Sequence, residues 1–259
     1  MTAHPSPCKQ LFSKCRDLLD RVEAQTETIE RVAEEFTETI AAGRMVHLFG
    51  SGHSRIMVEE MWPRYGSFPG FNPMVELSLT YHNSVIGSNG QRQAMFLENV
   101  SGLAERILRN YQLSEADSAL VISSSGCNIV PIEMAEGFQL RGVRVAVLVS
   151  YAHCLASKSQ RPDGKKLLDF ADFVLDTGAP AGDSLVSVDG LETPVSPGST
   201  IGGCLVVNAL KAEVAKRLAA LGQPPLVLTS SALIGPERAK QLFEAAYDEH
   251  GRRLSRLFA

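Results

Sequence analysis

The sequence predicts an α/β domain in which helices cover both faces of a parallel sheet. Apolar runs of strand length alternate along the chain with amphipathic segments of helix length, which is the pattern of consecutive βαβ units. The run at 119–122 is apolar throughout, as expected for a strand buried on both faces. The length of 259 residues suits one large domain with helical additions.

The composition argues against several classes of function. With a net charge of -4, the chain has no overall positive field to attract nucleic acid or an acidic membrane surface. No apolar run reaches the roughly 18 residues of a membrane span, and residues 1–9 lack the apolar core of a signal peptide. The five scattered cysteines form no CxxC pair. We expect a cytoplasmic protein with no metal, no cofactor and no nucleic-acid or membrane partner.

The first helical segment has the pattern of a packing helix. Ser6 and Pro7 are typical of a helix N-cap and first turn, and Gly43 is typical of the residue after a helix. Between them, apolar residues recur at steps of three, four and seven. We expect an N-terminal helical arm at 6–42, as one amphipathic helix or two joined helices, that covers the sheet or meets a partner subunit.

The remaining elements follow from the same patterns. Strands are expected at 44–49, 74–77, 79–82, 118–122, 143–149, 173–176 and 185–188. Helices are expected at 56–62, 92–110, 129–140, 167–170, 200–221 and 236–258. Ser199 or Thr200 has the residue type of a cap for the long helix at 200–221.

Three loops are expected at one edge of the sheet, because ligand-binding loops in parallel sheets follow the carboxyl ends of the strands. They are residues 50–54, 123–128 and 150–156. Backbone N–H groups at helix starts and serine hydroxyls both donate to anions, so this composition favours a phosphate site. A serine-rich turn is the alternative interpretation. The expected phosphate-binding residues are Gly52, Ser54, Ser123, Ser124, Ser125, Gly126 and Asn128, with Asn128 as helix N-cap or as donor.

A dinucleotide fingerprint is a competing interpretation of the first loop, with Glu76 as the acid that contacts a ribose. Arg55, however, stands near the position of the third glycine, where the helix must pack closely on the sheet. No GKS or GKT triplet follows a glycine-rich loop. The sequence therefore disfavours NAD(P) binding and excludes a Walker P-loop.

Acid–base chemistry requires side chains that exchange protons near neutral pH. Glu59 and Glu60 follow the first loop on the next helix, and only one of them can face the loop edge, since neighbouring helix positions point about 100° apart. That carboxylate is a candidate for proton transfer between C1 and C2 of a sugar, with a solvated surface pair as the alternative. His53 and His153 are further candidates because they lie within the expected ligand loops. Asp183 is interpreted as a turn-forming residue, with an acceptor of substrate hydroxyls as the alternative.

At these residues the chain resembles the sugar isomerase (SIS) domain family of phosphosugar-binding proteins. Gly50-Ser51-Gly52-His53-Ser54 is similar to the family's GxGxS after the first strand, and Ser123-Ser124-Ser125-Gly126 to its SxSG before a helix. The resemblance covers residues 32–221 as the core of a single domain spanning 1–259, with the helical arm at 6–42 and the helix at 236–258 as additions. It extends to an uncharacterised subgroup labelled as phosphoheptose or phosphosugar isomerases.

The resemblance implies a flavodoxin-like fold with a five-stranded parallel sheet and assembly as a homodimer or homotetramer. It also implies a sugar phosphate held by loop hydroxyls, here those of Ser54, Ser123 and Ser125. Where the family's isomerases carry their catalytic glutamate, this chain has Arg64, and Glu59 and Glu60 come earlier in the helix.

The sequence therefore predicts a phosphosugar-binding protein that acts as an aldose–ketose sugar-phosphate isomerase, with Glu60 and His153 transferring protons. The alternative is a non-catalytic phosphosugar sensor or binding protein.

Overall fold

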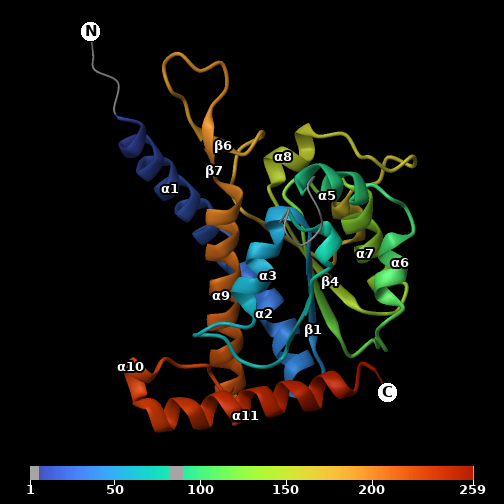
Figure 1. Ribbon diagram of the computed structural model, residues 1–259, viewed down its shortest axis with the longest axis vertical. Coiled ribbons are helices and arrows are strands. Elements are labelled where there is room, and N and C mark those ends of the chain that lie inside the picture. Colours follow the sequence, from blue (N-terminus) through green and yellow to red (C-terminus); the bar gives the residue numbers. More distant parts are fainter. Residues whose placement is uncertain (1–5, 82–89, 259) are drawn as a thin grey trace.

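Five parallel strands form the centre of the molecule in the order β2-β1-β3-β4-β5 (Figure 1). The strands are β1 (Val46–Gly50), β2 (Phe71–Met74), β3 (Ser118–Ile122), β4 (Arg144–Val149) and β5 (Phe173–Asp176). The computed structural model describes residues 6–81 and 90–258. It confirms the expected flavodoxin-like α/β class, with additional helices at both ends of the chain.

The strand order reverses between β1 and β3. The chain leaves β1 toward β2 on one side and later enters β3 on the other, and at such a point a crevice forms outside the carboxyl ends of the strands. Val46 pairs with Ser118 and Gly50 with Ile122, so β1 and β3 end level with each other. The loops at 51–54 and 123–128 therefore leave the sheet side by side.

Helices cover both faces of this sheet. On one face lie α1 (Pro7–Glu23), α2 (Thr26–Ala41), α3 (Arg55–Met61) and α9 (Ser199–Ala220). On the other lie α6 (Leu103–Leu108), α7 (Ile129–Gln139) and the 3-10 turn η3 (Leu167–Phe170), with α5 (Gln91–Leu97) and α8 (Tyr151–Ala156) near the carboxyl edge. The terminal helices α10 (Ser231–Ile234) and α11 (Pro236–Ser255) cross the opposite end of the molecule.

The strands divide the core into two layers because successive side chains point to opposite faces. Leu48 and Leu120 lie in the layer that contains Phe36 of α2. Val121 and Val147 lie in the other layer, which contains Phe138 of α7. Every residue of β1 and β3 is buried, which explains why their sequences show no polar alternation.

The N-terminal arm has the two-helix form of its two expected alternatives, and the segment at 92–110, expected as one helix, is divided. The N-terminal arm consists of α1 and α2 with a break at 24–25, and the Ser6 hydroxyl accepts a 3.4 Å hydrogen bond from the Lys9 N–H, as expected for its N-cap. The segment at 92–110 consists of α5 and α6. Gly102 begins α6 with φ 86°, a left-handed conformation that interrupts a helix.

Three expected strands require correction. At 74–77 and 79–82 the structure has the end of β2 and the 3-10 turn η2 (Leu77–Leu79), and residue 82 lies outside the described residues. The strand expected at 185–188 does not extend the main sheet. It is β6 (Ser184–Val186), which pairs antiparallel with β7 (Val195–Pro197) in a separate hairpin.

A close contact brings the start of α9 to the carboxyl edge of the sheet. A Cβ atom on Gly202 would lie 1.8 Å from the Thr177 carbonyl oxygen, so only glycine allows the first turn of α9 to touch the loop after β5. The helix begins at Ser199 after Gly198, one residue before the expected start, and neither Ser199 nor Thr200 is its N-cap residue.

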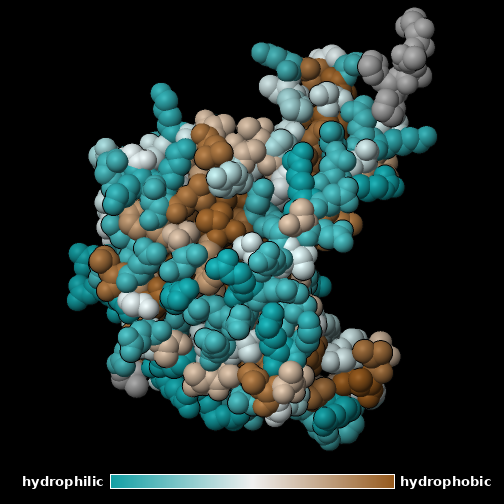
Figure 2. Space-filling model, turned by 180° about the vertical axis from the view of Figure 1, so that it is seen from behind, coloured by the Kyte–Doolittle hydropathy of each residue, from teal (hydrophilic) through white to brown (hydrophobic). Residues whose placement is uncertain are grey.

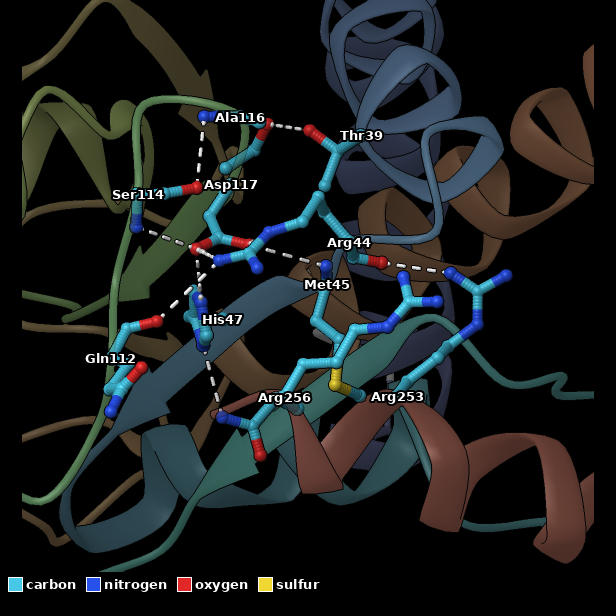
Figure 3. Close-up of polar contacts among 12 residues, drawn as sticks. Thr39, Arg44, Met45, His47, Gln112, Ser114, Ala116, Asp117, Arg253 and Arg256 are labelled. Carbon is cyan, nitrogen blue, oxygen red and sulfur yellow. Dashed lines mark hydrogen bonds and ion pairs between the residues drawn. The ribbon is translucent and has the colours of Figure 1, made fainter. Parts of the chain in front are cut away.

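A polar cluster closes the amino edge of the sheet, at the opposite end from these loops (Figure 3). The Asp117 carboxylate accepts hydrogen bonds from Arg44 Nε at 2.9 Å and Nη2 at 2.6 Å, and from the Ser114 N–H at 2.9 Å. His47 is fully buried, with Nε2 3.6 Å from Asp117 Oδ2 and Nδ1 3.0 Å from Asn72 Nδ2. Burial alone would raise the pKa of Asp117, but its interactions with the nearby His47 and with Arg44 lower it to about 2.

The C-terminal helix is fixed to the same edge. Arg253 donates to the carbonyl oxygens of Ile40 at 3.0 Å and Arg44 at 2.8 Å, and Arg256 donates to that of Gly43 at 3.0 Å. These carbonyls lie at and after the end of α2, where backbone acceptors have no partner within the helix. In the part of the chain that the structure describes, no helix has the length and apolar character of a membrane span.

We predict that Asp117→Asn lowers the free energy of unfolding by roughly 3 kcal/mol near neutral pH, because it leaves a partly buried arginine without its carboxylate. The folded-state pKa of Asp117, about 2, is below that of the unfolded chain. Its contribution is therefore present above about pH 4 and is lost as the pH falls toward about 2. Denaturant titrations should show the gap between wild type and variant narrowing over that range. The exposed Asp248→Asn serves as control; a constant gap would contradict the assignment.

Candidate functional site

A cavity of about 390 Å³ opens at the carboxyl edge of the sheet, over the ends of β1 and β3. Its wall combines the two loops that follow these strands with the starts of α8 and α9. The lining residues are Ser51, His53, Ser54, Met57, Tyr81, Glu98, Ser123, Ser124, Ser125, Asn128, His153, Asp183, Pro197, Ser199 and Thr200.

The loop after β3 holds its three serines in different ways. The Ser123 hydroxyl accepts from the Gly126 N–H at 3.2 Å, and the Ser125 hydroxyl accepts from the Cys127 N–H at 3.3 Å. The Ser124 hydroxyl is buried in the cavity wall and has no hydrogen-bond partner among residues 6–81 and 90–258. Gly126 adopts φ +59°, which glycine allows at low cost. The loop therefore presents a buried hydroxyl to the cavity, where a ligand or a water molecule can hydrogen-bond to it.

The loop after β1 is shaped by Gly52, at φ +53°. A Cβ atom there would lie 2.7 Å from the Tyr81 ring, so this glycine lets the aromatic ring approach the loop. Ser54 ends the 3-10 turn η1 (Gly52–Ser54) and lines the cavity. The His53 ring meets the Tyr81 ring edge-on, with centroids 4.9 Å apart.

Glu98 is a carboxyl group that is hydrogen-bonded to the serine loop. The sequence did not indicate it as a site residue. It follows α5, only 5% of its surface is exposed, and Asn128 Nδ2 donates to its Oε2 at 2.6 Å. Ser51 also hydrogen-bonds the carboxyl group. Burial raises the pKa of Glu98 above its usual value, although the bonds from Ser51 and Asn128 oppose part of that effect.

Backbone contacts fix the position of Glu98. Its carbonyl oxygen accepts from the Val130 N–H at 2.9 Å, so the end of α5 is tied to the first turn of α7. Asn128 is the N-cap residue of α7, as expected, but its side chain does not cap the helix. It bonds to Glu98 instead, so the loop that carries the serines also orients the carboxyl group.

His153 lines the same cavity from the first turn of α8. Its Nδ1 accepts from the Gly182 N–H at 2.9 Å. An accepting Nδ1 carries no proton, so in the neutral ring the proton is on Nε2. His153 lines the cavity, which makes this tautomer available for donation to a ligand.

Tyr81 adds a phenol hydroxyl to the proton donors of the cavity wall. Burial, with a further effect of the Glu98 charge, raises the pKa of Tyr81 to about 12. The phenol therefore keeps its proton at neutral pH. The sequence predicted a strand at 79–82 and did not indicate that Tyr81 lines the cavity.

Of the residues expected from the sequence, the structure brings one group together in the cavity wall: Ser54, Ser123, Ser124, Ser125, Asn128, His53 and His153. Gly52 and Gly126 shape the two loops without lining the cavity. The wall also contains Asp183, for which the sequence favoured a turn-forming role over that of an acceptor of substrate hydroxyls.

Glu59 and Glu60 do not line the cavity. The exposed Glu59 pairs with Arg55 at 3.3 Å. Glu60 bonds to Arg64 and accepts from Asn208 of α9 at 2.9 Å. Burial alone would raise the pKa of Glu60, but these hydrogen bonds lower it overall, which is unfavourable for a general base. Neither glutamate is therefore proposed as the base of this cavity.

Within residues 6–81 and 90–258, no group of three or more histidine, cysteine, aspartate or glutamate side chains is arranged to hold a metal ion. The polar atoms of the described cavity wall are hydroxyls, carboxyls, imidazoles and one amide. This donor set is suited to hydrogen bonding of an oxygen-rich ligand.

Comparisons with known proteins show the family of the chain and agree with its fold. The model of the SIS domain family matches residues 10–150, and the chain belongs to that family. It is 30% identical to a UPF0309 protein from Geobacillus sp., an alignment that covers 86% of this chain and 89% of that protein. It is 32% identical to a UPF0309 protein from Brucella canis, with 85% and 86% covered.

A solved structure shares the fold. A phosphoheptose isomerase from Francisella tularensis superposes with a TM-score of 0.50 at 14% identity, covering 82% of this chain and 100% of that one. The shared architecture is the five-stranded parallel sheet with its surrounding helices.

The serine loop allows a stability test. Ser124→Ala is expected to leave the free energy of unfolding unchanged or to raise it by up to about 1 kcal/mol, since it removes a buried hydroxyl that no described protein atom bonds. The matched variant Ser123→Ala should lower it by about 1 kcal/mol, because the Gly126 N–H loses its acceptor. Denaturant unfolding without ligand measures both. The opposite order of stabilities would contradict this description of the loop.

Proposed function

We propose that this protein binds a sugar monophosphate in the cavity and interconverts its aldose and ketose forms by proton transfer. The observation that carries the proposal is the buried Glu98 carboxyl group with a raised pKa, bonded to the same loop that presents the serine hydroxyls. Membership of the SIS domain family supports the ligand class, because phosphosugars are what such domains bind.

The phosphate is assigned to the loop after β3. The start of α7 contributes the partial positive charge of a helix N-terminus, and the hydroxyls of Ser123, Ser124 and Ser125 donate to phosphate oxygens. The Ser124 hydroxyl, which has no partner among the described protein atoms, is then bonded to the phosphate. Ser54 lies across the cavity on the neighbouring loop and can close the site from that side.

The sugar then extends toward Glu98 and His153. Isomerisation requires the proton on C2 to leave, the C1 and C2 oxygens to exchange a proton, and a proton to return at C1. A carboxylate whose pKa is raised toward neutrality accepts and returns the carbon proton efficiently. His153 Nε2–H and the Tyr81 hydroxyl are donors for the oxygens of the enediol intermediate.

We predict that Glu98→Gln abolishes exchange of the C2 hydrogen with solvent while ligand binding is retained. A panel of sugar phosphates is incubated with protein in deuterated water, and deuterium incorporation is followed by NMR. The variant should lose at least about 100-fold in exchange rate, since it lacks the proton acceptor. Glu59→Gln is the matched control, because it makes the same change at an exposed position outside the cavity.

Two outcomes separate the alternatives. Exchange that persists in Glu98→Gln would contradict the assignment of the base. Binding of sugar phosphates without exchange in the wild type would favour a non-catalytic sensor or binding protein. Retained binding by Glu98→Gln is established by titration calorimetry before the exchange rates are compared.

We also propose that the chain assembles as a homodimer or homotetramer. Figure 1 shows α1 and the β6–β7 hairpin projecting together from the body. Phe12 and Leu19 on α1 are 55% and 48% exposed, and Leu191 in the hairpin is 55% exposed. Figure 2 shows apolar side chains on this projection from behind. Exposed apolar residues gathered in this way are typical of an interface.

Light scattering after size-exclusion chromatography should give the mass of two or four chains for the wild type. Phe12→Glu combined with Leu19→Glu should shift the mass toward that of a smaller assembly, because charges enter an apolar contact. Ser13→Glu, which adds a charge at an exposed polar position of the same helix, should not. A wild type with the mass of one chain would contradict the assembly.

A further inference from the structure

We infer that Asp183 makes the cavity selective for sugar monophosphates and rejects sugar bisphosphates. The inference rests on the proposed function, since it concerns the end of the ligand that lies away from the serine loop. Three observations support it: the contacts of Asp183, the charges of the cavity wall, and the N–H groups at the start of α9 that already bond the Asp183 carboxylate.

Asp183 occupies the anion position at the start of α9. Its Oδ1 accepts from the N–H groups of Ser199 at 2.6 Å and Gly198 at 3.1 Å, and its Oδ2 accepts from the Ser199 hydroxyl at 2.8 Å. The donors are all neutral, so they hold a carboxylate without cancelling its charge. The residue has φ 67°, a conformation that aspartate and asparagine adopt more readily than most residues.

Among the helices that begin at this cavity, the two long ones, α7 and α9, differ in the availability of their N-termini. The start of α7 carries the serine loop, and the Asn128 side chain leaves it uncapped. The start of α9, a 22-residue helix, already holds the Asp183 carboxylate. A phosphate that arrived there would have to displace an internal anion from the same N–H groups.

No lysine or arginine is among the residues that line the cavity in the described part of the chain. The charged or titratable side chains of this wall are His53, Tyr81, Glu98, His153 and Asp183. A single phosphate is accommodated by hydroxyls and by the start of α7. A second phosphate at the other end would meet the Asp183 carboxylate with no cation to offset the repulsion.

The same carboxylate accepts hydrogen bonds from sugar hydroxyls, which a phosphate dianion does not offer. Asp183 therefore favours an unphosphorylated end and disfavours a phosphorylated one. The structure thus assigns specificity to a residue of the loop after β5, which is also the loop that fixes the His153 tautomer through Gly182.

The test compares matched ligand pairs by titration calorimetry: fructose 6-phosphate with fructose 1,6-bisphosphate, and ribulose 5-phosphate with ribulose 1,5-bisphosphate. For each protein the readout is the ratio of the two Kd values, bisphosphate over monophosphate. In the pair whose monophosphate binds more tightly, the wild type should bind the monophosphate at least tenfold more tightly than the bisphosphate. Asp183→Asn keeps a side chain that tolerates the left-handed backbone and should reduce this ratio at least tenfold.

Asp183→Gly provides an independent variant that also tolerates φ 67°. It removes the carboxylate and frees the N–H groups at the start of α9, so its ratio should fall further than that of Asp183→Asn. Asp189→Asn is the control. It makes the same charge change at an exposed position outside the cavity, in the loop between β6 and β7, and should keep the wild-type ratio.

Wild-type ratios near one, or wild-type ratios retained by both Asp183 variants in folded protein, would overturn the inference. Failure of the wild type to bind either monophosphate would instead contradict the proposed function. The two failures are distinguished because the monophosphate titration of the wild type is read first. Thermal unfolding of each variant establishes that it is folded before its ratio is compared.

Discussion

The hydrogen bond between Asn128 and Glu98 joins the two halves of the candidate site. It links the serine loop after β3 to a carboxyl group delivered by α5, and the bond between the Val130 N–H and the Glu98 carbonyl fixes the same junction through the backbone. Burial of the carboxyl group disfavours its charged form, whereas the amide of Asn128 and the hydroxyl of Ser51 stabilise that form. Burial is the larger effect, so the pKa of Glu98 is raised.

The two edges of the sheet differ in how their polar groups are satisfied. At the amino edge, Asp117 has several hydrogen-bond donors, including Arg44, and its pKa is well below the usual value. At the carboxyl edge, the buried Ser124 hydroxyl has no hydrogen-bond partner in the described part of the chain, and Glu98 has a raised pKa. The first arrangement stabilises the fold. The second stores unsatisfied hydrogen-bonding capacity where a ligand can use it, which is typical of functional sites.

The sequence predicted the parts of the site that depend only on strand ends. Ser54, Ser123 and His153 follow β1, β3 and β4 directly, so the parallel sheet brings them together whatever path the connecting segments take. Glu98 was not predictable in this way, because its position depends on how α5 returns to the cavity after the segment at 82–89. Its sequence context is that of an ordinary amphipathic helix.

Local rules also left the roles of other acids undetermined. Helix periodicity showed that Glu59 and Glu60 cannot both face the loops, but α3 has only seven residues and its rotation is set by packing. That packing turns Glu60 toward Asn208 of α9. Asp183 was correctly expected in a turn, yet its contacts with Gly198 and Ser199 connect positions 15 and 16 residues apart, which no local pattern encodes.

The central claim is that one cavity holds the phosphate at the serine loop and the reacting carbons at Glu98. The most direct measurement is a crystal structure of the protein with a phosphorylated aldonic acid, an open-chain analogue of the enediol intermediate. The account predicts phosphate oxygens within hydrogen-bonding distance of the Ser123, Ser124 and Ser125 hydroxyls, with the analogue's carboxylate end beside Glu98 and His153. A phosphate bound at the start of α9, or an analogue whose carboxylate end lies away from Glu98, would contradict it.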